Sequence, residues 1–173
     1  MKLEFRKLRA DEIECRVGQI VAGKGLTLLL YKDARCDMNI LDETVGALNW
    51  KREHRRENAN CIVSIYDEEK GEWVSKEDTG SESNTEAEKG LASDSFKRAC
   101  VNWGIGRELY TSPFIWIKAE DVELVTGNNG KSQCRTKFAV DSIDYDANGK
   151  ISMLHIKSLG KGGKNVYSHG KKS

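Results

Sequence analysis

The chain has 173 residues, with 28 Lys or Arg against 27 Asp or Glu, so its formal net charge is +1. This length suits one domain with a substantial core. No apolar run reaches the ~20 residues of a membrane-spanning helix, and residues 1–14 are too charged for a secretory signal, so we expect no membrane partner and a cytoplasmic location.

The balanced total charge conceals an uneven distribution. Residues 1–130 contain 19 basic and 24 acidic side chains, whereas residues 131–173 contain 9 basic and 3 acidic ones. Because binding of nucleic acid depends on the local field, a net charge of +1 does not exclude it. The five cysteines form no C-x-x-C pair, and the sequence predicts neither a disulfide scaffold nor a metal site.

The first third of the chain predicts a strand pair and a helix. Two apolar runs, 16–22 and 26–31, flank a Gly-Lys-Gly turn and suit paired strands. Asp37 can cap the following helix, which we expect to end near Asn49-Trp50. Its expected apolar stripe consists of Met38, Leu41, Val45 and Leu48.

A three-stranded meander and a long helix are expected next. The strands are predicted at about 50–57, 60–66 and 72–78, with a turn at 67–71. Thr85 and Glu88 form a capping box that opens a helix over 86–103. The predicted core stripe of this helix consists of Ala92, Phe96, Ala99, Cys100 and Trp103.

The last third predicts a strand at 114–117 and a hairpin that pairs 137–145 with 150–158 around an Asn-Gly turn. Residues 157–173 combine lysines with Gly and Ser and suit a flexible basic tail. We therefore expect a single domain over 1–156. Its class is α+β, with an antiparallel β-β-β-α core and an added C-terminal hairpin.

Basic side chains mark two candidate surfaces for phosphates. Strand alternation places Arg52, His54 and Arg56 on one face of the first meander strand. On the long helix, Lys89 and Lys97 lie opposite the core stripe, with Arg98 beside them. On spacing alone, an ordinary solvated surface is the commoner explanation for either set.

No catalytic arrangement is predicted. Glu68 and Lys70 could suggest a metal nuclease, but they lie in a polar turn where solvated charge is common. The phosphate-loop-like segment at 18–24 lacks the Ser or Thr that would bind magnesium, and the three histidines have no partner at motif spacing. We expect no enzyme activity and no cofactor.

Two segments resemble the Rad-fifty-two superfamily of single-strand annealing proteins, most closely its bacteriophage and prophage branch. They are residues 90–110 (GLASDSFKRACVNWGIGRELY) and residues 39–50 (NILDETVGALNW). The resemblance covers about residues 13–117. It implies the β-β-β-α core, DNA binding by Lys97 and Arg98, and a basic residue near the first helix. That position is Cys36 here, and the adjacent Arg35 is the candidate substitute.

The resemblance implies ATP-independent binding of single-stranded DNA and annealing of complementary strands in phage homologous recombination, in the cytoplasm of a bacterial host. It also implies assembly into a ring or helical filament and contact with the annealed duplex DNA. An exonuclease or a host single-strand binding protein is a further candidate partner. The alternatives are a passive single-strand binding or accessory protein, a metal nuclease and a purely structural oligomer.

Overall fold

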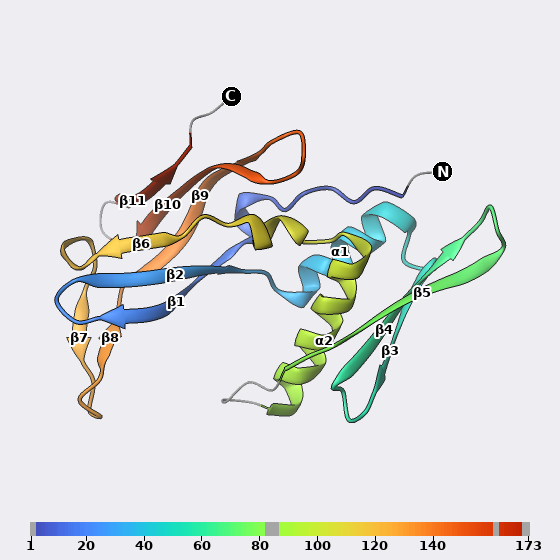
Figure 1. The fold of residues 1–173 in the computed structure, drawn as a ribbon, viewed down its shortest axis with the longest axis horizontal. Coiled ribbons are helices and arrows are strands. Elements are labelled where there is room, and N and C mark those ends of the chain that lie inside the picture. The colour runs from blue at the N-terminus through green and yellow to red at the C-terminus, as the bar shows by residue number, and fades with distance from the viewer. Residues whose placement is uncertain (1–2, 82–86, 161–162, 171–173) are drawn as a thin grey trace. The chain divides into compact units, whose positions relative to one another are not determined.

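The computed structural model describes residues 3–81, 87–160 and 163–170, with only the backbone at 87–89. The chain divides into two compact units, one of residues 1–7 and 33–107 and the other of residues 8–32 and 108–173. In the described residues, two α-helices accompany strands that pair antiparallel throughout (Figure 1). The predicted mixture of helices and antiparallel strands is confirmed.

Helix α1 (Ala34–Val45) begins earlier than predicted. Its N-cap is Asp33, whose side chain accepts a hydrogen bond from the Arg35 N–H, and Gly46 ends the helix at φ 86°. The predicted cap, Asp37, lies inside the helix and is buried. The predicted stripe was also wrong at Leu48, which lies beyond the helix end and is 92% exposed.

The meander consists of β3 (Trp50–Arg55), β4 (Asn60–Asp67) and β5 (Glu72–Thr79), in the order β3-β4-β5. Strand β3 ends two residues before the predicted position. Arg56, Glu57 and Asn58 follow it at positive φ values of 50–71°, which no regular strand allows. Asp67 accepts hydrogen bonds from the backbone N–H groups of residues 69 and 70 and closes the next turn.

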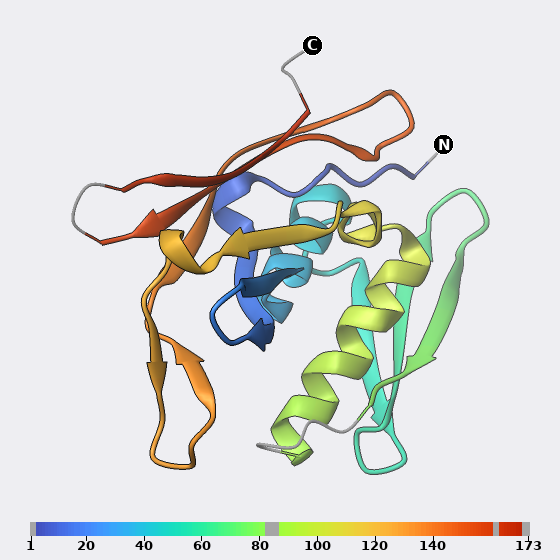
Figure 2. The ribbon, with the colours of Figure 1, turned by 60° about the vertical axis from the view of Figure 1, so that its left-hand side comes forward.

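Helix α2 (Ala87–Trp103) packs against β4 and β5 (Figure 2). Phe96, Ala99 and Cys100 are fully buried, as the stripe predicted, whereas Ala92 and Trp103 are half-buried. The indole of Trp103 donates to the Val63 carbonyl oxygen at 3.0 Å, which ties the end of α2 to the central strand. The predicted capping box lies outside the described residues, as Thr85 and the Glu88 side chain are not described.

The second unit is built on a six-stranded sheet in the order β11-β10-β9-β1-β2-β6. Its core includes Leu26, Ile117, Leu154 and Ile156, all with an exposed fraction of 0%. Among the described residues, short 3₁₀ segments occupy 10–12, 107–111 and 119–121, of which Arg107 belongs to the first unit. The strands of this unit, including the separate pair β7–β8, are β1 (Glu14–Val21), β2 (Gly25–Tyr31), β6 (Ile115–Lys118), β7 (Leu124–Thr126), β8 (Ser132–Cys134), β9 (Lys137–Tyr145), β10 (Ile151–Leu159) and β11 (Asn165–His169).

The C-terminal hairpin of β9 and β10 lies within one residue of its predicted bounds. The prediction of a flexible tail over 157–173 is wrong for residues 157–160 and 163–170, which are the described ones. Residues 157–159 continue β10, and β11 pairs antiparallel with β10, with His155 opposite Ser168. Pairing with a strand that is already part of the sheet supplies the hydrogen bonds that this Gly-rich segment could not form alone.

Candidate nucleic-acid interface

Helix α2 carries two predicted DNA-binding residues side by side. Lys97 and Arg98 follow the buried Phe96 and precede the buried Ala99, and both are half-buried. The burial of Phe96, Ala99 and Cys100 fixes the rotation of the helix about its axis. Lys97 and Arg98 therefore project from the part of α2 that remains outside the core.

Arg98 is paired with an acidic residue one helical turn earlier. Its Nε donates to Asp94 Oδ2 at 2.9 Å, and the same oxygen accepts from the Ser81 N–H at 2.9 Å. Burial raises the pKa of Asp94, but the hydrogen bonds from Ser81 and Arg98 and the charges of Arg98 and Lys97 outweigh it, so the pKa is lowered. Asp94 is ionised at neutral pH.

A second ion pair lies at the N-terminus of α1. The Arg35 guanidinium donates to Asp33 Oδ2 from Nη2 at 2.9 Å and from Nε at 3.2 Å. Hydrogen bonds from the side chain and backbone of Arg35 lower the pKa of Asp33 despite its partial burial, and the charges of Arg35 and Lys97 lower it further. Lys97 is thus close enough to act on both Asp33 and Asp94. Helices α1 and α2 contact each other. Arg35 and Arg98 pair with these two aspartates and Lys97 acts on both, and we call these three cations the basic cluster.

Arg52 lies on the face of β3 that packs on α2. Its guanidinium carbon lies 4.8 Å from the ring centroid of Phe96, and the same ring stacks on Trp50 at 6.1 Å. This contact holds the Arg52 guanidinium against α2 at Phe96, the residue before Lys97.

His54 does not supply the positive charge expected of it. Burial lowers its pKa, and the neighbouring charge of Arg52 lowers it further. Its Nδ1 lies 3.4 Å from the Oγ of the fully buried Ser95, whose hydroxyl donates to the Asn58 carbonyl oxygen at 2.9 Å. This side chain therefore fixes β3 to α2 in its neutral form.

Besides Arg52, two further predicted site residues are not assigned to the basic cluster. Arg56 lies in the turn after β3 at φ 50°, so the strand alternation that predicted it beside Arg52 does not apply. Lys89 belongs to α2, but its side chain lies outside the described residues.

The opposite face of the meander carries further aromatic and charged side chains. Lys51 Nζ lies 4.3 Å from the ring centroid of Trp73, which packs at 5.4 Å against Tyr66. Glu53 accepts a hydrogen bond from Arg55 at 2.9 Å on the same face. Here the two signs of charge alternate, and no basic excess develops.

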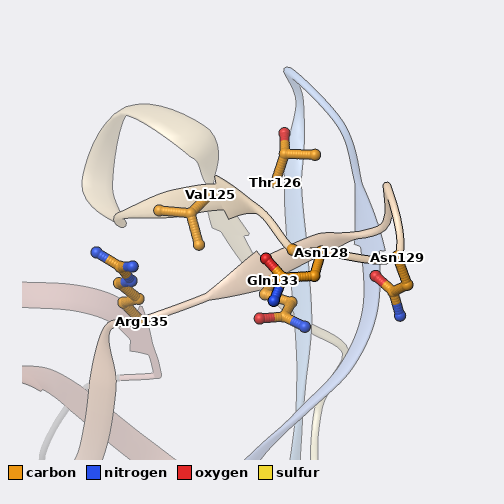
Figure 3. A pocket seen from close by; sticks show the side chains of 7 residues that line it. Val125, Thr126, Asn128, Asn129, Gln133 and Arg135 are labelled. Carbon is orange, nitrogen blue, oxygen red and sulfur yellow. The ribbon is translucent and has the colours of Figure 1, made fainter.

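In the second unit, the hairpin of β7 and β8 contains an open pocket of about 330 Å³ (Figure 3). Residues 125–129, Gln133 and Arg135 line it, and Arg135 forms an ion pair with Glu123 at 3.5 Å. Arg135 is the one charged residue that lines this pocket, and the other polar groups are amides and a hydroxyl. These groups do not form a pair of a general acid and a general base. Among the described residues, no group of His, Cys, Asp or Glu could hold a metal ion, and no helix is long and apolar enough to span a membrane.

Asp33 and Asp94 were not predicted as members of the site. A signal for Asp94 was present, because Asp and Arg at positions i and i+4 face each other on a helix. The sequence signal for Asp33 was weaker. Asp33 could be recognised as the N-cap only if the start of α1 had been placed at Ala34 and not after Asp37. The effect of the Lys97 charge on Asp33 could not be predicted from the sequence, because the two residues lie far apart along the chain.

The comparisons with known proteins give one positive result. Searches of curated proteins and of solved structures found no match. A family model described as Rad52/22 family double-strand break repair protein matches residues 5–124, which is more than half of the chain and includes all of the basic cluster. The chain belongs to the Rad52/22 family of double-strand break repair proteins.

Proposed function

We propose that this protein binds single-stranded DNA through Arg35, Lys97, Arg98 and Arg52 and anneals complementary strands without ATP. The observation that carries the proposal is the basic cluster. Arg35 pairs with Asp33, Arg98 pairs with Asp94, and the charge of Lys97 acts on both aspartates, in a chain whose family repairs double-strand breaks. Arg56 and Lys89 remain candidates for additional phosphate contacts.

The chemistry of the cluster suits a grip on the DNA backbone. Lys and Arg contacts to phosphates hold a strand without selecting its sequence, and they leave the base edges available for pairing. Annealing forms hydrogen bonds between bases and breaks no covalent bond, so it needs no general acid, general base or nucleotide. The function is accordingly that of an annealing protein rather than of an enzyme.

The proposal extends to the fold core, the assembly and the cellular setting of the protein. We infer that β3, β4, β5 and α2 are the family's β-β-β-α core, and that protomers assemble into a ring or helical filament. Assembly would align many clusters along one strand and turn weak sites into strong avidity. We further infer a bacteriophage or prophage origin, action in the bacterial cytoplasm on single strands and the annealed duplex, and cooperation with an exonuclease or host single-strand binding protein.

An annealing assay tests the proposal directly. Two complementary oligonucleotides that carry a donor and an acceptor dye are mixed with and without the protein, in buffer that contains neither ATP nor magnesium. We expect the protein to accelerate duplex formation. Two non-complementary oligonucleotides serve as the control and should give no energy transfer.

The annealing assay, together with a binding titration and the addition of magnesium, separates the alternative functions. A passive single-strand binding protein would bind each labelled strand but would not accelerate pairing. A nuclease would shorten the oligonucleotides once magnesium is added. A purely structural oligomer would show no binding of single-stranded DNA that weakens with salt.

A further inference from the structure

We propose that Asp33 and Asp94 compete with DNA phosphates for Arg35 and Arg98, and thereby hold the affinity for single-stranded DNA below what the cations alone would give. The inference rests on the proposed function, since it concerns the regulation of that same site. It assigns a role to two acidic residues that do not themselves bind the strand.

The pair at α1 has the geometry of phosphate recognition. Arg35 directs Nε and Nη2 at the carboxylate of Asp33, with distances of 3.2 and 2.9 Å to Oδ2. A guanidinium binds carboxylate and phosphate oxygens through the same fork of N–H groups. A phosphate that approaches this fork therefore meets a carboxylate that already uses the same donors.

The pair on α2 has a similar arrangement. Arg98 Nε donates to Asp94 Oδ2 at 2.9 Å, and the side chains of Arg98 and Asp94 are 42% and 31% exposed. The solvent access of Arg98 allows a phosphate to reach it. That phosphate would again share the guanidinium with a fixed negative charge.

Both carboxylates are anchored to the backbone, so they cannot readily swing away from an arriving phosphate. Asp33 is the N-cap of α1 and accepts from the Arg35 N–H at 2.7 Å. Asp94 Oδ2 accepts from the Ser81 N–H at 2.9 Å. An unanchored surface acid could rotate into solvent, whereas these two keep their charge beside the cations when DNA binds.

Lys97 extends the effect, because its charge favours the ionised form of both Asp33 and Asp94. By the same interaction, each carboxylate partly neutralises Lys97. A carboxylate and a phosphate that flank one cation at about 6 Å repel each other enough to weaken binding roughly threefold to tenfold per site in a largely aqueous surface environment. A lower affinity would let a bound strand dissociate from the protein and test another partner strand during the search for its complement.

The experiment compares Asp33→Asn, Asp94→Asn and the double variant with the wild-type protein. Asparagine removes the charge but keeps an oxygen that can accept from the Arg35 or Ser81 N–H, and it is as good an N-cap as aspartate. The control is Glu53→Gln, which removes a charge from the opposite face of β3, where Glu53 pairs with Arg55 at 2.9 Å. Thermal unfolding confirms that each variant is folded.

Binding to a fluorescein-labelled oligothymidine is measured by anisotropy over a series of salt concentrations. We expect each single variant to bind roughly threefold to tenfold more tightly than wild type at low salt, with a gain that shrinks as salt screens the repulsion, and the control to be unchanged. Unchanged or weaker binding of folded Asp33→Asn and Asp94→Asn would overturn the inference, as would an equal gain from Glu53→Gln. If the wild type itself fails to bind, the proposed function fails and this inference with it, whereas wild-type binding without a gain overturns the inference alone.

Discussion

Replacing Lys97 and Arg98 together by alanine is the most direct perturbation of the basic cluster. The two residues are adjacent on α2, and both lie outside the buried stripe formed by Phe96, Ala99 and Cys100. Alanine favours the helical conformation, so α2 should persist in the double variant. The change therefore removes two cations and leaves the core of the unit intact.

The magnitude follows from the exposure of the contacts. A hydrogen bond to a charged group contributes about 1.5–3 kcal/mol, and the 42% exposure of the Arg98 side chain places its contact at or below the lower end. Two such contacts give about 2–3 kcal/mol, which corresponds to roughly 30-fold to 150-fold weaker binding. The slope of log K against log salt should fall by about 1.4, as each phosphate contact on a single strand contributes about 0.7.

The assay is a salt titration of oligothymidine binding, followed by anisotropy. The matched control is Lys51→Ala with Arg55→Ala, which also removes two cations but from the face of β3 that is turned away from α2. We expect the control to keep most of the affinity and the salt slope. Equal losses in the two double variants would refute the reasoning, because binding would then depend on total charge and not on the cluster.

Two further predictions concern the packing that positions the cluster. Phe96→Ala should destabilise the protein by about 3–5 kcal/mol, because the ring is fully buried and stacks on Trp50 at 6.1 Å; urea unfolding measures this, and a loss below about 1 kcal/mol would contradict the packing described. His54 has a pKa below the ordinary 6.5, so the unfolded chain binds more protons than the folded one between the two values. The stability that neutral His54 contributes should be present above pH 6.5 and lost as the pH falls through its lowered pKa. Unfolding free energies of wild type and His54→Gln, compared across this window, should converge as the pH falls, and a constant difference would rule the titration out.

Much of the first unit was predictable because its elements obey local rules. The stripe of α2 predicted a helix whose observed N-terminus differs by one residue, and all three meander strands were placed within two residues of their ends. The errors arose where two local signals competed. Asp33 and Asp37 are both acceptable N-caps, and burial of Asp37 among the residues of α1 that face the core is a tertiary property that propensity does not report.

The second unit contains a strand, β11, that the sequence analysis did not predict. Residues 157–173 are rich in Gly and Lys, which are depleted in strands, and within β11 only Val166 and Tyr167 favour a strand. The strand exists because β10 offers an edge with which it can pair, from Leu154 opposite His169 to Lys157 opposite Asn165. Two strand-favouring residues among Gly and Lys are too weak a signal to predict this strand without its neighbour.

The sequence by itself determined the balanced charge with its uneven distribution, the alternation of faces on β3 and the side of α2 on which Lys97 and Arg98 lie. These properties depend on neighbours within a few positions along the chain. Only the tertiary structure decided that the Arg52 face of β3 turns toward Phe96, that His54 is neutral, and that the charge of Lys97 acts on Asp33. Those relations join separate elements, and the packing of apolar side chains sets them, because it fixes how each helix and strand is rotated against the next.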